Sequence, residues 1–194
     1  MVTSRQLYLL LLGLLACERL LELVVSRRNA RRAFERGGYE VGAPHFRAMA
    51  LVHALFIPAC AAEVLLFERA FPGALGGVAL AGALLAQGLR YWALRTLGDR
   101  WNVRIIVVPG ADPVTRGPYR FLRHPNYLAV ILEMACVPLI HGAWLSALAF
   151  SAANASLLRR RIPAEEQALG MAYQKAFGGK ARFLPAGSRA RAGP

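Results

Sequence analysis

Five apolar stretches alternate with polar, arginine-rich connectors along this 194-residue chain. The apolar stretches cover approximately residues 6–25, 48–67, 74–94, 127–140 and 143–158. The first three have about the 20 residues that a helix needs to cross a bilayer. The last two are shorter, and they flank a proline and a His-Gly pair, so together they read as a helical hairpin that crosses and returns. The pattern predicts an all-α integral membrane protein with about five transmembrane helices.

The positive charge of the connectors predicts the orientation of these spans. Most Arg and Lys residues fall after the first span, after the third span and in the C-terminal segment, whereas the opposite side holds essentially Arg5 and Arg69. Because cytoplasmic loops carry the excess of Lys and Arg, the N-terminus is expected outside and the C-terminus in the cytoplasm. The formal net charge of +13 follows from the same bias and suits anionic lipid, and no nucleic-acid-binding module is visible.

Several polar segments have their own expected structures. The β-branched run at residues 105–108 is too short to cross a membrane and predicts an extended segment. A cytoplasmic helix is expected over residues 163–177, with Pro163 at its start, and the tail after Gly178 is expected to be loose. Glu18 and Glu22 share one face of the first span and either reach the interface or form an inward polar face.

Residues 116–133 join a basic, turn-rich half to an apolar half. His124 precedes Pro125, which favours an extended backbone at His124, and Pro125 suits the first position of a helix. The free amides of that helix start would face back toward Tyr119, Arg123 and His124. This junction of water and lipid is a candidate place to hold a polar cofactor beside an apolar substrate.

A second polar block lies on the same predicted side of the membrane and contains Asn154, Arg161, Glu165 and Glu166. Arg161 and Glu165 are four residues apart, so they could pair or bind the opposite charges of a zwitterion. They could equally be part of a stop-transfer arginine cluster and a helix-start preference for acidic residues. Motifs of soluble nucleotide folds, P-loops and serine hydrolases are absent, and no residue spacing indicates a metal site.

Two segments resemble the isoprenylcysteine carboxyl methyltransferase family. They are Gly-Pro-Tyr-Arg-Phe-Leu-Arg-His-Pro-Asn-Tyr at 117–127 and Arg-Ile-Pro-Ala-Glu-Glu-Gln-Ala-Leu at 161–169. The resemblance covers roughly residues 75–185 well and continues through the N-terminal third, where the chain looks like a bacterial branch associated with type III polyketide synthases. It implies one membrane methyltransferase domain over residues 1–194 that uses S-adenosylmethionine.

The resemblance also implies the roles of particular residues. It places a cytoplasmic cofactor pocket between the connector before span four and the C-terminal helix. The expected catalytic residues are Arg161 and Glu165. The expected cofactor-binding residues are Tyr119, Arg123, His124, Pro125, Tyr127, Asn154 and Glu166.

The expected reaction is methyl transfer to an oxygen of a lipophilic acceptor, such as an isoprenylcysteine carboxylate or the acidic hydroxyl of a long-chain alkylpyrone. Such an oxygen needs no strong base, so positioning and dehydration would do most of the catalysis, with Arg161 orienting the anion. The expected location is a bacterial inner membrane, and the expected partners are the acceptor and the lipid bilayer. Two alternatives stay open: an NADPH-dependent sterol-type reductase, and a non-enzymatic lipid-binding membrane protein.

Overall fold

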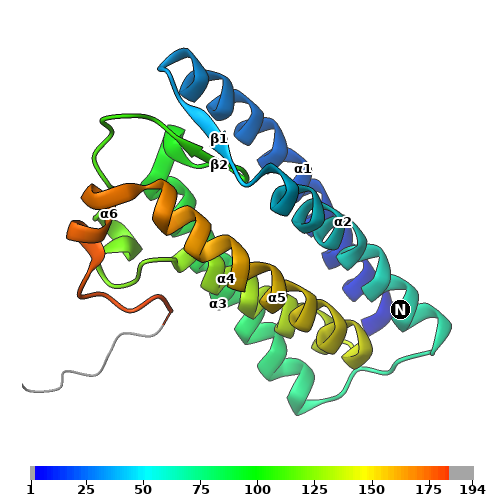
Figure 1. Ribbon diagram of the computed structural model, residues 1–194. Helices are drawn as coiled ribbons and strands as arrows, with labels where there is room; N and C mark the ends of the chain where they lie inside the picture. Colours follow the sequence, from blue (N-terminus) through cyan, green and yellow to red (C-terminus); the bar gives the residue numbers. More distant parts are fainter. Residues whose placement is uncertain (1–2, 184–194) are drawn as a thin grey trace, which may run out of the picture.

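The computed structural model describes residues 3–183, and this part of the chain is mostly helical (Figure 1). The helices are α1 Ser4–Glu35, α2 Ala43–Leu66, α3 Ala74–Leu97, α4 Pro125–Leu139, α5 Trp144–Ala168 and α6 Gly170–Phe177. Two short strands, β1 Tyr39–Val41 and β2 Ile105–Val107, pair antiparallel with Glu40 opposite Ile106. Short 3₁₀ turns span Gly98–Arg100 and Gly117–Arg120.

The five long helices run lengthwise, and the strands and α6 gather at one end of them (Figure 1). We call this end the β end. The C-termini of α1, α3 and α5 and the start of α4 lie there. Both segments that the sequence singles out therefore lie at the β end, because one immediately precedes α4 and the other occupies the last turns of α5.

Local sequence signals explain several helix ends. Thr3 caps α1 through a capping box with Gln6, in which each residue's side chain binds the backbone amide of the other. Pro125 occupies the first turn of α4, and His124 before it has a non-helical backbone, as the sequence predicted. Gly170 has a φ of +69°, which glycine adopts without strain, and it separates α5 from α6.

Small residues let α3 approach α4 closely. A Cβ atom at Gly82 would lie 2.7 Å from the sulfur of Cys136, and one at Gly76 would lie 2.8 Å from the carbonyl oxygen of Ile140. The glycine- and alanine-rich sequence of α3 is thus explained by packing, as in many helix pairs of membrane proteins. The main apolar core joins all five long helices around residues such as Leu12, Val64 and Met134.

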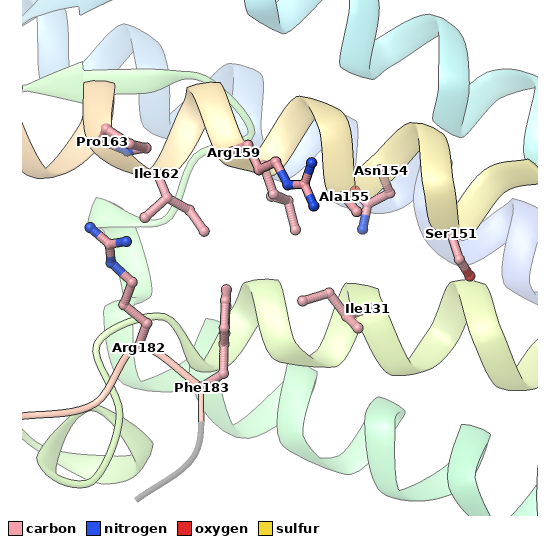
Figure 2. Close-up of a pocket in the computed structure, with 10 residues that line it drawn as sticks. Ile131, Ser151, Asn154, Ala155, Arg159, Ile162, Pro163, Arg182 and Phe183 are labelled. Atoms are coloured by element: carbon pink, nitrogen blue, oxygen red, sulfur yellow. The ribbon is translucent and has the colours of Figure 1, made fainter. Parts of the chain in front are cut away.

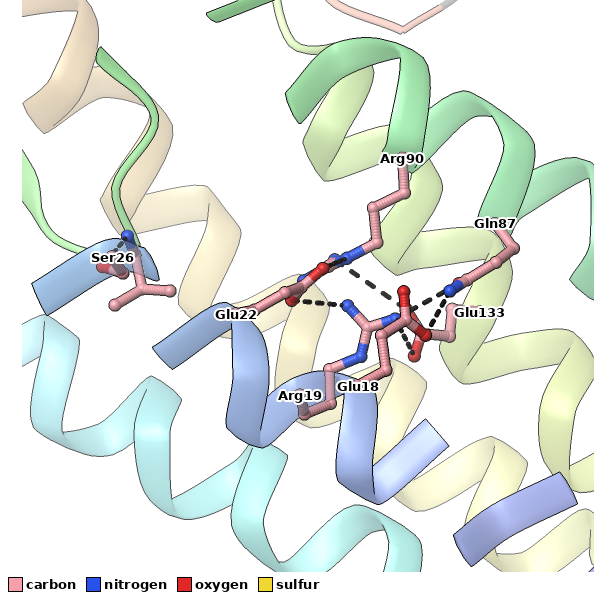
Figure 3. A network of polar contacts seen from close by, with 8 residues as sticks. Glu18, Arg19, Glu22, Ser26, Gln87, Arg90 and Glu133 are labelled. Carbon is pink, nitrogen blue, oxygen red and sulfur yellow. Dashed lines mark hydrogen bonds and ion pairs between the residues drawn. The ribbon is translucent and has the colours of Figure 1, made fainter. Parts of the chain in front are cut away.

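Charged side chains meet inside the bundle between α1, α3 and α4 (Figure 3). Glu22 accepts hydrogen bonds from Arg90 at 2.8 and 2.5 Å and from Arg19 at 2.7 Å. Arg19 also lies 3.6 Å from Glu133 of α4. Of the two interpretations of the acidic residues in the first span, the inward polar face is therefore correct.

The outer surface of the helices is largely apolar, which reverses the arrangement of a water-soluble bundle. Large exposed side chains include Leu10, Leu14, Leu20, Leu21, Leu51, Leu66, Val78, Leu84, Leu85 and Leu148. Exposed apolar surface around buried, paired charges is the arrangement expected of helices in lipid. Residues Phe46–Leu66 form the one helix within residues 3–183 that is both long and apolar enough to cross a bilayer.

The structure confirms one expectation about these elements and corrects two. The extended run is confirmed as β2, but its partner β1 was not predicted. The expected helix start at Pro163 is wrong, because α5 runs through Pro163 to Ala168, and the segment expected at 163–177 is split between α5 and α6. Pro163 removes one backbone hydrogen bond, and the helix persists because Arg161 and Glu165, on either side of Pro163, are both anchored on α4.

The pairing of Glu22 with Arg90 predicts a strong effect on stability. Arg90→Ala leaves a buried carboxylate without its main partner and should lower the free energy of unfolding by about 3–5 kcal/mol. Thermal unfolding in detergent measures this effect. Arg31→Ala is the control, because Arg31 pairs with Glu35 on the exposed face of α1 and should change the unfolding midpoint little. Equal effects of the two substitutions would contradict the structural role of the pair.

Candidate active site

Tyr127, near the start of α4, joins the two residues predicted to be catalytic. Arg161 Nε donates to the Tyr127 hydroxyl at 2.7 Å, and that hydroxyl donates to the Glu165 carboxylate. Arg161 and Glu165 lie on one face of α5 because they are four residues apart. They do not bind each other directly; Tyr127 connects them. Arg161 is only 4% exposed, whereas Arg159 and Arg160 are exposed, so the three arginines are not one uniform surface cluster.

Arg161 has a further contact that the sequence did not predict. Its Nη2 atom donates to the carbonyl oxygen of Val103 at 2.6 Å. The Val103 amide in turn donates to the Ser26 hydroxyl of α1 at 3.1 Å, and that hydroxyl donates to Asn102 Oδ1 at 3.0 Å. Asn102 Nδ2 returns a bond to the Ser26 carbonyl at 2.9 Å. Helix α1 therefore fixes the backbone that receives Arg161.

A second group of polar side chains lies between His124 and Glu166. His124 Nε2 lies 3.0 Å from Glu166 Oε1, and the His124 side chain is 5% exposed. Arg182 donates two hydrogen bonds to the same carboxylate, at 3.0 and 2.6 Å. Burial raises the pKa of Glu166, but the bonds from Arg182 and His124 outweigh it and hold that pKa below its usual 4.5.

Residues 178–182 lie along the connector that precedes α4. The amides of Arg123 and His124 donate to the carbonyl oxygens of Ala181 and Arg182, at 3.0 and 3.2 Å. The Arg123 guanidinium donates to the carbonyl of Lys180 at 2.6 Å. The expectation of a loose tail after Gly178 is therefore wrong as far as residue 183, because unpaired amides of the connector find acceptors there. The rest of the tail lies outside the described residues.

Tyr119 contributes to a small apolar core at the β end. It is buried with Ala93 of α3 and with Tyr173 and Phe177 of α6. Burial, together with the nearby negative charge of Glu165, raises the pKa of Tyr119, so its hydroxyl stays protonated. The Tyr173 hydroxyl lies 3.5 Å from His124 Nε2, so α6 also reaches the second polar group.

A cavity of about 360 Å³ lies between α4 and α5, next to these polar groups (Figure 2). Its walls are mainly apolar, with Ile131 from α4 and Leu158 and Ile162 from α5. Asn154 faces it; the residue is 1% exposed and its Oδ1 atom has no hydrogen-bond partner within residues 3–183. Arg182 lines the cavity and also binds Glu166, so it connects the cavity to the second polar group.

The structure thus sorts the nine predicted site residues into four sets. Arg161, Glu165 and Tyr127 form one hydrogen-bonded group, and His124 and Glu166 form another. Asn154 lines the cavity. Tyr119, Arg123 and Pro125 lie in the surrounding framework: a small core, contacts to the C-terminal segment and the first turn of α4.

The sequence analysis missed residues that complete these groups. Ser26, Asn102 and the Val103 carbonyl were not assigned to the site, because a contact between the Arg161 side chain and a backbone carbonyl 58 residues away has no sequence pattern of its own. Arg182 and Tyr173 lie beyond the last motif. Opposite charges in two apolar spans, Glu22 and Arg90, do carry a signal, since charges in lipid seek partners.

The Glu166 contacts predict how stability depends on pH. A carboxyl whose folded pKa is depressed stabilises the fold above its unfolded pKa, and this stabilisation is lost as pH falls through the lower folded value. Wild-type protein should therefore lose stability relative to Glu166→Gln as pH falls below about 4.5. Unfolding midpoints of both proteins between neutral and acidic pH measure the difference. A difference that stays constant over this range would contradict the role of the Glu166 carboxylate.

Comparisons with known proteins place both segments within one family match. The family model described as "Isoprenylcysteine carboxyl methyltransferase (ICMT) family" matches residues 78–171. This range contains Tyr127, Arg161 and Glu165 of the first polar group and His124 and Glu166 of the second, but neither Tyr173 nor Arg182. The chain is 41% identical over 160 residues to the uncharacterized protein YpbQ of Bacillus subtilis, covering 82% of this chain and 95% of that protein. It is 24% identical over 158 residues to an uncharacterized protein of Haemophilus influenzae, covering 81% and 91%. The chain therefore belongs to the isoprenylcysteine carboxyl methyltransferase family, a family of membrane methyltransferases.

Proposed function

We propose that this protein is an integral membrane methyltransferase that uses S-adenosylmethionine to methylate an oxygen of a lipophilic acceptor. The observation that carries the proposal is the position of Arg161, which is buried and bound to Tyr127 at the end of an apolar bundle, on the helix that also contributes Asn154, Leu158 and Ile162 to the cavity. An anionic, oily acceptor needs this combination of a buried cation and apolar surroundings. Family membership supports methyl transfer as the reaction.

The apolar parts of the five long helices, approximately residues 6–25, 48–67, 74–94, 127–140 and 143–158, are proposed as the membrane spans, with α4 and α5 as a tight hairpin around Gly142. Glu63 of α2 supports this hairpin by accepting the Ser146 amide at 2.7 Å, which satisfies a donor at the start of α5. The β end holds most of the arginines and is proposed to face the cytoplasm, with the N-terminus on the other side of a bacterial inner membrane. Charged side chains within the spans are compatible with a membrane location because Glu22, Arg90 and their partners bind one another inside the bundle.

The residues around the cavity fit S-adenosylmethionine. The volume of the cavity falls within the usual range for small-molecule sites, about 300–1,000 Å³. The unpartnered Asn154 amide oxygen can accept an N–H group, and Nη1 of Arg182, the nitrogen atom that does not bind Glu166, can donate to a carboxylate oxygen. The apolar side chains Leu158 and Ile162 suit the face of an adenine ring. The bound cofactor would supply an electrophilic methyl group on a sulfonium, which becomes a neutral thioether when the acceptor oxygen takes the methyl.

Arg161 is proposed to hold the acceptor oxygen. Two of its nitrogen atoms bind Tyr127 and Val103, and the third, Nη1, has no hydrogen-bond partner within residues 3–183. These two bonds fix the plane of the guanidinium, so its remaining donors point in one direction and need little reordering on binding. Glu165 acts through Tyr127, whose hydroxyl proton it accepts, which leaves the hydroxyl oxygen available to Arg161.

Calorimetric titration of detergent-solubilised protein with S-adenosylhomocysteine tests the cofactor. Saturation at one site supports the proposal. Binding of NADPH instead would favour a sterol-type reductase, and binding of neither would favour a non-enzymatic lipid-binding protein. Asn154→Ala should weaken binding of S-adenosylhomocysteine about 10-fold, because it removes a buried polar contact worth roughly 1.5 kcal/mol. An unchanged affinity in this variant would place the cofactor elsewhere.

Substitution of Arg161 tests its role in orienting the acceptor. Arg161→Ala should lower turnover by about 100-fold or more while changing cofactor affinity little, since the lost contact is made to the acceptor. Arg160→Ala is the matched control, because Arg160 is exposed on the same turn of α5. The assignment is wrong if Arg161→Ala abolishes cofactor binding while Glu165→Ala leaves turnover unchanged.

The acceptor itself can be identified by mass spectrometry of lipid extracts incubated with the enzyme and a cofactor carrying a labelled methyl group. We expect the label on an oxygen of a carboxylate or acidic hydroxyl attached to a long hydrocarbon, such as a prenylated cysteine or an alkylpyrone. Label on nitrogen or carbon would contradict O-methylation, and absence of label with Arg161→Ala is the negative control.

A further inference from the structure

A second, larger groove lies between α1 and α3, and it shares no lining residue with the cavity at α4 and α5. Its volume is about 560 Å³, and it opens toward the outside of the bundle. Its apolar part is lined by Leu21 and Val25 of α1 and by Tyr91 of α3, all of which are exposed. Its basic part is lined by Arg28 and Arg32 of α1 and by Arg95 of α3.

The apolar part and the basic part follow each other in the same order along α1 and along α3, because the two helices run in the same direction. Glu18 binds Gln87, Glu22 binds Arg90, and further along Asn29 of α1 donates to the carbonyl of Trp101, which follows α3. Residue numbers thus rise together on the two sides. Both walls of the groove are apolar toward the middle of the bundle and become basic toward the β end. The groove is therefore complementary to an amphiphile whose anionic headgroup lies at the β end and whose apolar part lies toward the middle of the bundle.

The basic part of the groove has uncompensated positive charge. Arg28, Arg32 and Arg95 have no hydrogen-bond or ion-pair partner within residues 3–183. The acidic residues that also line the groove are already paired. Glu22 binds Arg90 at 2.5 Å, and Asp99 binds Arg36 at 2.9 Å.

Glu18, the remaining acidic residue of the groove, lies 3.3 Å from Arg19. Three arginines therefore line the groove without an acidic partner of their own within residues 3–183. Such an arrangement in a membrane is complementary to a phosphate-bearing headgroup.

We propose that this groove binds one anionic phospholipid, with its phosphate at Arg28, Arg32 and Arg95 and an acyl chain along Leu21 and Val25. The exposed Tyr91 ring suits the boundary between headgroup and hydrocarbon, where aromatic side chains are enriched. The site is distinct from the cavity that faces Asn154. The proposal rests on the membrane location in the proposed function but not on methyl transfer.

Native mass spectrometry tests the proposal with phosphatidylglycerol and phosphatidylcholine of identical acyl chains, without cofactor or acceptor. Wild-type protein should retain one phosphatidylglycerol about 100-fold more tightly than phosphatidylcholine. The triple variant Arg28→Gln/Arg32→Gln/Arg95→Gln should lose this preference, since each arginine near a headgroup contributes roughly fivefold. An excess of inorganic phosphate should not displace the lipid, because the acyl chain contributes to binding.

The matched control is Arg27→Gln/Arg47→Gln/Arg160→Gln, which removes the same charge from exposed positions outside the groove. This control should keep the preference within about twofold. The proposal is overturned if the control triple loses as much affinity as the groove triple, or if both lipids bind wild-type protein equally.

A photoreactive phosphatidylglycerol provides a second test that needs no variant. It should label peptides that contain residues 21–32 and 91–101 of the wild-type protein. Labelling confined to other peptides would overturn the proposal. Because neither measurement uses turnover, failure here would leave the proposed methyltransferase activity standing, and loss of that activity would not affect the lipid site.

Discussion

A buried guanidinium needs a hydrogen-bond acceptor for each donor that water no longer reaches, and this constraint on Arg161 organises the β end of the bundle. Arg161 meets it at two of its three nitrogen atoms, with Tyr127 of α4 and with the carbonyl of Val103. The connector that carries Val103 is held in turn by Ser26 of α1. One side chain thus ties together the first, third, fourth and fifth long helices, so the geometry of the candidate site depends on segments far from it in sequence.

The same constraint operates deeper in the bundle. Glu22 and Arg90 satisfy each other between α1 and α3, and Arg19 extends the contact toward Glu133 of α4. In lipid these charges would be costly without partners, so the pairing specifies which helices lie together. The result is a bundle with polar contacts inside and apolar side chains outside. Under the proposed function, that arrangement would let an oily acceptor diffuse in the membrane while its polar group reaches the β end.

The Glu166 carboxylate has a comparable role at the edge of the site. It receives bonds from Arg182 of the C-terminal segment and lies against His124 before α4. Charge therefore holds the C-terminal segment over the connector, next to the cavity that faces Asn154. A ligand in that cavity would be enclosed by α4, α5 and this segment together.

Much of this arrangement could be predicted from the sequence, and the rest could not for physical reasons. The helical class, the extended run at β2 and the start of α4 at Pro125 follow from hydropathy and proline geometry. The continuation of α5 through Pro163 was missed because tertiary contacts of Arg161 and Glu165 outweigh the local effect of a proline. The Val103 carbonyl was missed because backbone acceptors carry no side-chain signature.

A structure of the protein with bound S-adenosylhomocysteine tests the central claim most directly. The account predicts that the ligand lies between α4 and α5, contacts Asn154 and is covered by the segment that carries Arg182. We also expect Arg161 to keep its bond to Tyr127, with its Nη1 atom directed toward the position of the acceptor oxygen. A ligand bound outside this cavity, or an Arg161 side chain turned away from it into solvent, would contradict the account.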